Sequence, residues 1–182
     1  MTSFLHDLTG SFSQSAAQNP TVDIMEAGYA AHNLHIRYIN CEVAPEDLAA
    51  AVSGAVAMGW LGFNCSLPHK ESVVPLLDEL APSASVIGAV NTVVITDGRL
   101  IGENTDGKGF VESLAPIRDP KGAHVVIFGA GGAARAIAVE LALAGAAEIT
   151  IVNRTAQRGD DLAELLNTRT DSRATSVAWS PQ

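Results

Sequence analysis

The sequence predicts an α/β protein, because short apolar runs typical of strands alternate with helix-forming segments along most of its 182 residues. Its composition is 47% hydrophobic and 17% charged, which is typical of a globular protein able to bury a core. Residues 115–122 contain two prolines and a glycine and interrupt the alternation. We therefore expect two domains, at residues 1–106 and 107–182, with the boundary next to the helix that precedes this break.

The first half contains strand and helix patterns separated by turn residues. Strands are predicted at residues 37–43, 61–67, 88–95 and 100–102. Helices are predicted at residues 45–59 and 70–80. Pro45 suits the first turn of the earlier helix, and Gly59 suits its end. Gly98 lies in the turn at residues 96–99 and tolerates a positive φ there.

The second half repeats the alternation with more apolar elements. Helices are predicted at residues 106–114, 133–144 and 156–166. Strands are predicted at residues 124–128 and 148–152, with a third candidate at 174–179. Strands that are separated by helices favour parallel pairing within one sheet.

Charge is distributed unevenly and excludes some classes of function. The net charge is −9, and residues 1–106 hold three cations against twelve acids, whereas residues 107–182 hold eight of each. Nucleic-acid binding needs clustered lysine and arginine, so we expect no nucleic-acid partner. The first ten residues do not resemble a signal peptide, and Arg135 and Glu140 interrupt the most apolar stretch. We expect no membrane span and a cytoplasmic location.

The two cysteines, Cys41 and Cys65, form no CxxC pair, and the five histidines match no metal-ligand spacing. We therefore expect two free thiols in a reducing compartment and no metal site.

A glycine-rich turn predicts a nucleotide site. Gly129-x-Gly131-x-x-Ala134 follows a predicted strand and opens a predicted helix, which is the context that the dinucleotide fingerprint requires. Gly129 permits a tight turn, Gly131 lets the backbone approach a pyrophosphate, and Ala134 lets helix and strand pack closely. The helix N-terminus offers N–H groups to phosphates. The predicted cofactor-binding residues here are Gly129, Ala130, Gly131, Gly132, Ala133 and Ala134.

The next strand end predicts which dinucleotide binds. Asn153, Arg154, Thr155 and Arg158 follow that strand, and the first carboxylate after it is Asp160. NAD-binding proteins usually have an acid at this turn, whereas a guanidinium suits the 2′-phosphate of NADP. We expect NADP, with two solvated arginines at a helix start as the alternative. The predicted fold class is thus an N-terminal α/β domain followed by a partial Rossmann dinucleotide-binding domain.

Four segments together resemble the shikimate dehydrogenase family. They are Asn64-Cys-Ser66-x-Pro68-His-Lys70-Glu, Gly88-Ala-Val-Asn91-Thr92, Asn104-Thr105-Asp106-Gly107-x-Gly109-Phe110, and the Gly129 loop followed by Asn153-Arg154-Thr155. The resemblance covers residues 35–160. It implies an N-terminal substrate domain and NADP-dependent oxidation of shikimate, a cyclohexene polyol, to its 3-dehydro ketone, a step of aromatic amino acid biosynthesis.

The resemblance implies that Lys70 and Asp106 form the catalytic pair. Ketone reduction by hydride needs a proton donor at the developing alkoxide, and a lysine in a cleft can serve as one. Lys70 is one of three cations in an acidic half, which agrees with that role. The alternatives are a surface lysine and, for Asp106, a helix N-cap.

The resemblance also implies a polar substrate site. Asn64, Ser66 and Asn91 lie at strand ends and would bind ring hydroxyls. Members of the family usually hold the shikimate carboxylate with a Ser-x-Ser-Pro segment near the N-terminus, and this chain lacks that spacing. Ser11, Ser13 and Asn19 are the candidate replacements. Quinate or a related ring acid therefore fits as an alternative substrate.

The dinucleotide domain is expected to be incomplete, because residues 124–182 supply only two or three of about six strands. The second class of function considered is a non-catalytic, truncated module that binds a ring acid or nucleotide. A homodimer is one expected assembly.

Overall fold

The structure is a computed structural model that describes residues 5–179. The chain divides into two compact units. Unit 1 contains residues 1–84 and 88–103, and unit 2 contains residues 85–87 and 104–182. This division falls after Glu103, and the predicted boundary at residue 106 stays a prediction.

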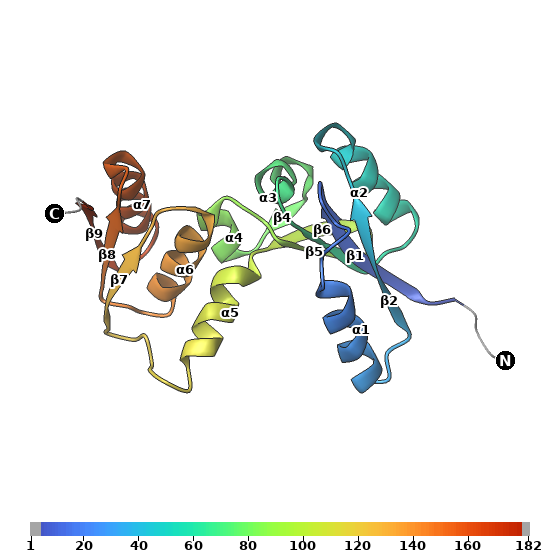
Figure 1. The fold of residues 1–182 in the computed structure, drawn as a ribbon, viewed down its shortest axis with the longest axis horizontal. Helices are drawn as coiled ribbons and strands as arrows, with labels where there is room; N and C mark the ends of the chain where they lie inside the picture. The colour runs from blue at the N-terminus through green and yellow to red at the C-terminus, as the bar shows by residue number, and fades with distance from the viewer. Residues whose placement is uncertain (1–4, 180–182) are drawn as a thin grey trace. The chain divides into compact units, whose positions relative to one another are not determined.

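Unit 1 is built around a six-stranded mixed sheet (Figure 1). Its strands follow the order β2-β1-β3-β5-β6-β4. β1 pairs in parallel with both β2 and β3, whereas β3, β5 and β6 pair antiparallel. The strands are β1 Asp7–Ser13, β2 Ile36–Glu42, β3 Gly62–Cys65, β4 Glu79–Leu80, β5 Thr92–Thr96 and β6 Arg99–Glu103. The helices are α1 Thr21–Ala31, η1 Pro45–Asp47, α2 Leu48–Ala57, α3 His69–Ser72, η2 Val74–Leu76 and α4 Pro82–Ile87.

Aromatic side chains form the centre of the unit 1 core. The rings of Phe12 and Phe63 stack with centroids 4.6 Å apart, and Trp60 lies 5.8 Å from Phe12. All three are buried, with at most 5% of their surface exposed. Apolar burial of this kind contributes about 25 cal/mol per Å², so these rings fix the strands that carry the polar side chains described below.

Several predictions in unit 1 are confirmed and two are wrong. The predicted strands at 37–43 and 61–67 correspond to β2 and β3, and Gly59 ends α2 with φ +70°. The helix predicted at 70–80 is wrong: Pro75 interrupts it, and Asp78 exchanges hydrogen bonds with Leu100 that align β4 with β6. The strand predicted from residue 88 begins at Thr92 instead, because Gly88 (φ +73°) caps α4. The patterns predict none of β1, α1, β4 and α4.

Unit 2 contains a three-stranded parallel sheet in the order β7-β8-β9 (Figure 1). Its elements are α5 Thr105–Leu114, β7 His124–Phe128, α6 Gly132–Leu143, β8 Glu148–Asn153, α7 Ala156–Arg169 and β9 Arg173–Ala178. The predicted strands, including the third candidate, are confirmed. Buried aliphatic residues of β8, α6 and α7 form the core, among them Ile149, Ile151, Leu141 and Leu166.

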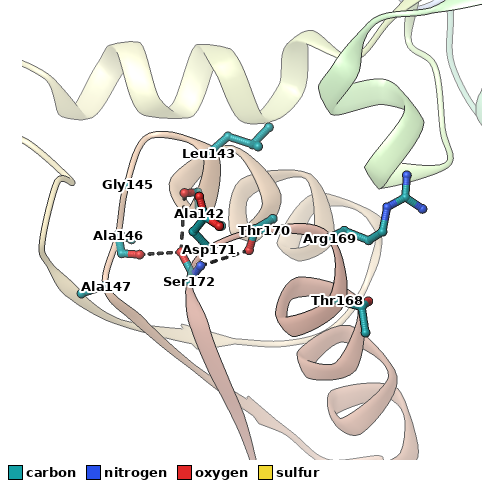
Figure 2. Close-up of a pocket in the computed structure, with 10 residues that line it drawn as sticks. All are labelled: Ala142, Leu143, Gly145, Ala146, Ala147, Thr168, Arg169, Thr170, Asp171 and Ser172. Carbon is teal, nitrogen blue, oxygen red and sulfur yellow. Dashed lines mark hydrogen bonds between the residues drawn. The ribbon is translucent and has the colours of Figure 1, made fainter.

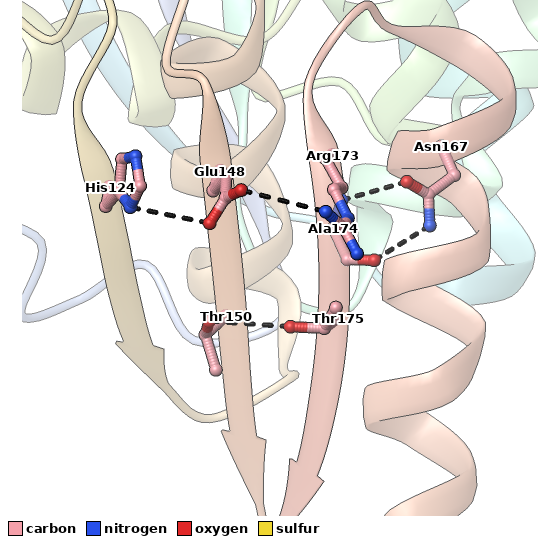
Figure 3. A network of polar contacts seen from close by, with 7 residues as sticks. All are labelled: His124, Glu148, Thr150, Asn167, Arg173, Ala174 and Thr175. Carbon is pink, nitrogen blue, oxygen red and sulfur yellow. Dashed lines mark hydrogen bonds and ion pairs between the residues drawn. The ribbon is translucent and has the colours of Figure 1, made fainter.

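Polar cross-strand pairs accompany the register of this sheet (Figure 3). Glu148 lies opposite both His124 and Arg173, with its carboxylate 3.4 Å from His124 Nδ1 and 3.9 Å from an Arg173 nitrogen. Thr150 and Thr175 are also opposite each other, with their hydroxyls 3.4 Å apart. These side chains are exposed, so they specify register more than they add stability.

Among residues 5–179, no helix is both long enough and apolar enough to cross a membrane. Within the same residues, no group of three or more histidine, cysteine, aspartate or glutamate side chains is placed to hold a metal ion.

Candidate functional site

The glycine turn of unit 2 joins the carboxyl end of β7 to α6. Gly129 adopts φ +117° and donates its N–H to the Val152 carbonyl at 2.8 Å, which ties the turn to β8. A Cβ built on Gly131 or Gly132 would meet nothing within 4 Å, so the start of α6 is open. Gly131 is the N-cap of α6 and makes no side-chain capping hydrogen bond. Gly131, Gly132 and Ala133 are exposed, so the first turn of this helix is accessible, as a phosphate-binding turn requires.

The residues after β8 form the second part of this nucleotide-binding candidate. Asn153 donates from its amide to the Thr155 carbonyl at 2.8 Å, which shapes the turn before α7. Arg154 and Arg158 are exposed. Asp160, the first carboxylate in the sequence after β8, accepts a 2.6 Å hydrogen bond from the Ser176 hydroxyl. Residues 153–155, the turn itself, hold one guanidinium and no carboxylate.

Unit 1 carries a row of polar side chains across four strands, which we call the polar row: Asn40, Ser11, Asn64 and Thr92. Ser11 lies opposite Asn40 on β2 and opposite Asn64 on β3, and Asn64 lies opposite Thr92 on β5. Residues directly opposite each other project from the same face of a sheet. The row lies in the carboxyl-terminal halves of the parallel strands β1 and β2, the edge at which α/β sheets usually bind ligands.

Asn64 is held in place from both sides. The Tyr38 hydroxyl donates to Asn64 Oδ1 at 2.8 Å. Asn64 Nδ2 donates to Thr92 Oγ1 at 3.0 Å and to the Asn91 carbonyl at 3.2 Å. Burial raises the pKa of the Tyr38 phenol, so this hydroxyl keeps the proton that it donates. Asn64 and Asn91, two predicted substrate-binding residues, are thus brought together.

Ser11, Ser13 and Asn19, the three candidates for binding a substrate carboxylate, all make hydrogen bonds to other residues of the chain. The Ser11 hydroxyl, 1% exposed, donates to Asn40 Oδ1 at 2.9 Å and accepts from Asn19 Nδ2 at 3.3 Å. Asn19 Oδ1 accepts from the Thr21 N–H and hydroxyl at 3.1 and 2.7 Å. Ser13 is also buried, and its hydroxyl accepts from the Ser15 N–H at 3.1 Å. Their role in binding substrate stays a prediction.

Lys70 lies in the single-turn helix α3, which is anchored on both sides. His69 is fully buried, and its Nε2 lies 2.9 Å from the Val43 carbonyl, so this histidine is structural. The Lys70 carbonyl accepts from Val90 N–H at 2.7 Å. Burial raises the pKa of the neighbouring Cys65 thiol to about 12, and the positive charge of Lys70 opposes that shift. Cys65 and Cys41 are both free thiols.

Asp106 lies in the first turn of α5, in unit 2. The alternative prediction, that Asp106 is the N-cap of this helix, is wrong. Asn104 occupies the N-cap position, and its side chain accepts from the Asp106 N–H at 3.1 Å. Ser66 is exposed just after β3, next to α3. The catalytic roles of Lys70 and Asp106 stay predictions.

Three polar residues of the site escaped the sequence analysis: Tyr38, Asn40 and Glu42. They alternate along β2 and therefore project from one face of that strand. A strand pattern of Ile-Arg-Tyr-Ile-Asn-Cys-Glu contains this alternation, and it is the signal that could have identified them.

One cavity of unit 2 lies away from both candidate sites. It has a volume of about 540 Å³ and lies beside the ends of α6 and α7 and the starts of β8 and β9 (Figure 2). Ser172 is one of the lining residues, and its hydroxyl donates to the Ala146 carbonyl. In a parallel sheet this edge is opposite the glycine turn, which follows the carboxyl end of β7.

The fold and these two sites define an α/β protein with a glycine turn typical of dinucleotide-binding folds and a polar site in its other unit. Comparison with protein families agrees. The model described as "Shikimate dehydrogenase substrate binding domain" matches residues 13–93, and the model described as "Shikimate / quinate 5-dehydrogenase" matches residues 112–177. The chain belongs to the shikimate dehydrogenase family.

Individual relatives are similar over most of the chain. A shikimate dehydrogenase (NADP(+)) from Symbiobacterium thermophilum is 44% identical over 170 residues, which is 92% of this chain and 58% of the relative. The ligand-free 5-ketofructose reductase of Gluconobacter sp. strain CHM43 is 59% identical with a TM-score of 0.96, covering 98% of this chain and 64% of the reductase. Shikimate 5-dehydrogenase from Listeria monocytogenes, in complex with shikimate and NAD, is 34% identical with a TM-score of 0.92, covering 98% and 64%. The chain thus spans little more than half the length of the curated relatives that it matches.

Proposed function

We propose that the protein is an NADP-dependent oxidoreductase of the shikimate dehydrogenase type. It would transfer hydride reversibly between the cofactor and a small polyhydroxylated molecule, interconverting a secondary alcohol and a ketone. Shikimate and 3-dehydroshikimate are the first pair to test, and quinate is the next. The observation that carries this proposal is the open glycine turn at the start of α6, in a chain whose relatives are named as NADP-dependent dehydrogenases.

The residues of unit 2 fit the cofactor. The N–H groups at the start of α6 would hold the pyrophosphate, and the open space beside Gly131 and Gly132 accommodates its oxygens. Arg154 and Arg158 would hold the 2′-phosphate, which distinguishes NADP from NAD. When bound, the cofactor supplies the hydride acceptor or donor.

The residues of unit 1 would hold the substrate and move its proton. Asn64 and Asn91 would bind hydroxyls, since a polyol needs groups that both donate and accept hydrogen bonds. Lys70 would donate a proton to the ketone oxygen during reduction and take it back during oxidation. Asp106 would be the second catalytic residue and would exchange the proton with the lysine during turnover.

The test is a spectrophotometric assay of NADP reduction with the full-length protein. Turnover with shikimate or quinate supports the proposal, and the same assay with NAD checks the cofactor. Ligand binding without turnover on any substrate tested would favour the non-catalytic module instead.

A cytoplasmic location and a homodimer are further proposals, tested by cell fractionation and by light scattering of the purified protein.

A second candidate function is the reduction of a ketose. It is favoured by the 59% identity to 5-ketofructose reductase over 98% of this chain. The chemistry is the same, because a ketone is again reduced by hydride with a proton supplied at its oxygen. Reduction of 5-ketofructose by NADPH is the direct assay.

A further inference from the structure

The segment between β1 and α1, residues 14–20, is fastened to β2 by two side chains. Asn40 Nδ2 donates to the carbonyls of Asn19 at 2.9 Å and Ala16 at 3.3 Å. Asn40 Oδ1 accepts a hydrogen bond from the Ser11 hydroxyl. Both the oxygen and the nitrogen of this amide therefore bond to other groups of the protein. These bonds hold the segment against Asn40, the β2 member of the polar row.

A carboxylate of the protein itself occupies the backbone donors of this segment. Glu42 Oε1 accepts from the N–H groups of Ala16 and Ala17 at 3.3 and 3.4 Å. Backbone N–H groups of a loop are the kind of donor that binds an anionic ligand group. Here they already face a negative charge, so a second carboxylate placed beside them would be repelled.

Unit 1 offers little positive charge to offset that repulsion. Its sequence holds three cations and eleven acids. Arg37 pairs with Glu26 at 2.7 Å, and Arg99 pairs with Glu79 at 3.3 Å. The third cation is Lys70, to which the proposed function assigns proton transfer.

We propose that the substrate site of unit 1 selects an uncharged polyhydroxy ketone over a ring acid, with Asn40 and Glu42 as the residues that set this preference. The inference rests on the proposed function and deepens it. The polar groups at Asn64, Asn91 and Thr92 suit such a molecule, because they are uncharged amides and a hydroxyl. Asn64 Oδ1 has two lone pairs and the Tyr38 hydroxyl takes one, so this oxygen can accept from a substrate hydroxyl.

The experiment compares two ring compounds that differ in charge and hardly in size: shikimate and its uncharged primary amide. The full-length enzyme is assayed with NADP and each compound, and with NADPH and 5-ketofructose. We expect kcat/KM for the amide to exceed that for shikimate by about tenfold or more, the usual scale for one charge-dependent contact, and we expect 5-ketofructose to be reduced. A kcat/KM for shikimate equal to or above that of the amide would overturn the inference and leave the proposed function standing.

Glu42→Gln keeps the acceptor oxygen and removes the charge. It should raise kcat/KM for shikimate several-fold and leave the value for the amide nearly unchanged, whereas Glu46→Gln, at an exposed position in η1, should change neither. An equal effect on both compounds contradicts the role given to Glu42. Calorimetric titration of both compounds decides the preference without turnover: tighter binding of the amide supports the inference and equal binding overturns it. Absence of turnover with all three compounds would contradict the proposed function alone.

Discussion

Replacing Arg154 with alanine should reduce the preference for NADP over NAD that we propose for this protein. Arg154 is exposed and lies in the turn directly after β8. The neighbouring Asn153 is neutral and is occupied by the Thr155 carbonyl, and the Asp160 carboxylate accepts from Ser176. Residues 153–155 contain no carboxylate that would repel a 2′-phosphate, so we expect Arg154 to be the main source of selectivity.

The size of the effect follows from the contacts that a guanidinium makes with phosphate. A charge-assisted hydrogen bond contributes about 1.5–3 kcal/mol, and 1.4 kcal/mol corresponds to a tenfold change in affinity. Loss of one such contact should weaken NADP binding by roughly tenfold to a hundredfold. Arg158 remains in the variant, which keeps the loss at the lower end of this range. NAD lacks the phosphate, and its affinity should change by less than about twofold, since only the 2′-position is affected.

The assay is calorimetric titration of wild type, Arg154→Ala and Arg154→Lys with both cofactors. The lysine variant keeps the charge and loses the two-pronged geometry, so its NADP affinity should lie between the other two. Arg169→Ala is the matched control, because Arg169 is an exposed arginine at the other end of α7. Equal losses for NADP and NAD in Arg154→Ala would refute the reasoning, since the arginine would then support the turn or the adenosine generally.

Three further predictions concern other parts of the chain. Lys70→Ala should lower kcat by ~10²–10⁴-fold with NADP affinity unchanged. A near-normal rate of hydride transfer in a single-turnover assay of this variant would show that Lys70 is not the proton donor. Gly107→Ala should destabilise the protein by about 1–3 kcal/mol in urea unfolding, because the added Cβ would collide with the backbone carbonyl of Ala136 and lie 2.6 Å from Glu140 Cγ. The control Gly109→Ala, whose Cβ meets nothing within 4 Å, should be neutral or slightly stabilising. Burial raises the pKa of Cys65 from 9.0 to about 12, so the unfolded thiol ionises first and the free energy of unfolding should fall as pH rises across that interval. Cys65→Ala should flatten this slope in alkaline urea titrations, and an unchanged slope would mean that other groups cause it.

The sequence predicts the secondary structure of unit 2 well, because local signals define its helices and strands. A buried strand, a glycine turn and an alanine-rich helix lie next to one another, so β7, Gly129 and α6 appear nearly where expected. The second and third strands follow at similar spacing. In unit 1 the local signal is weaker at residues 70–80, where pairing of Asp78 with Leu100 overrides the helical pattern. Tertiary pairing of this kind is not encoded in local propensity.

The candidate substrate site is predicted only in part, for a related reason. Asn64, Asn91 and Lys70 belong to short motifs, so a sequence pattern can identify them. Asn40 and Glu42 belong to no motif, and they reach the site because the parallel register places β2 beside β1. A register between distant strands is set by the whole hydrophobic pattern and by the connections, which no short segment contains.

The hydrogen bonds of the polar row also decide what each variant can report. Ser11 is buried and links Asn40 to Asn19, so truncating it would leave two polar groups unpaired and loosen the segment at residues 14–20. Its effect on kinetics would therefore combine a change of shape with any loss of substrate contact. Ser66 is exposed beside α3, and truncation there leaves the core and the polar row intact. A change of KM in Ser66→Ala with unchanged unfolding free energy would accordingly measure substrate contact alone, which makes Ser66 the sharper probe of how this site binds hydroxyls.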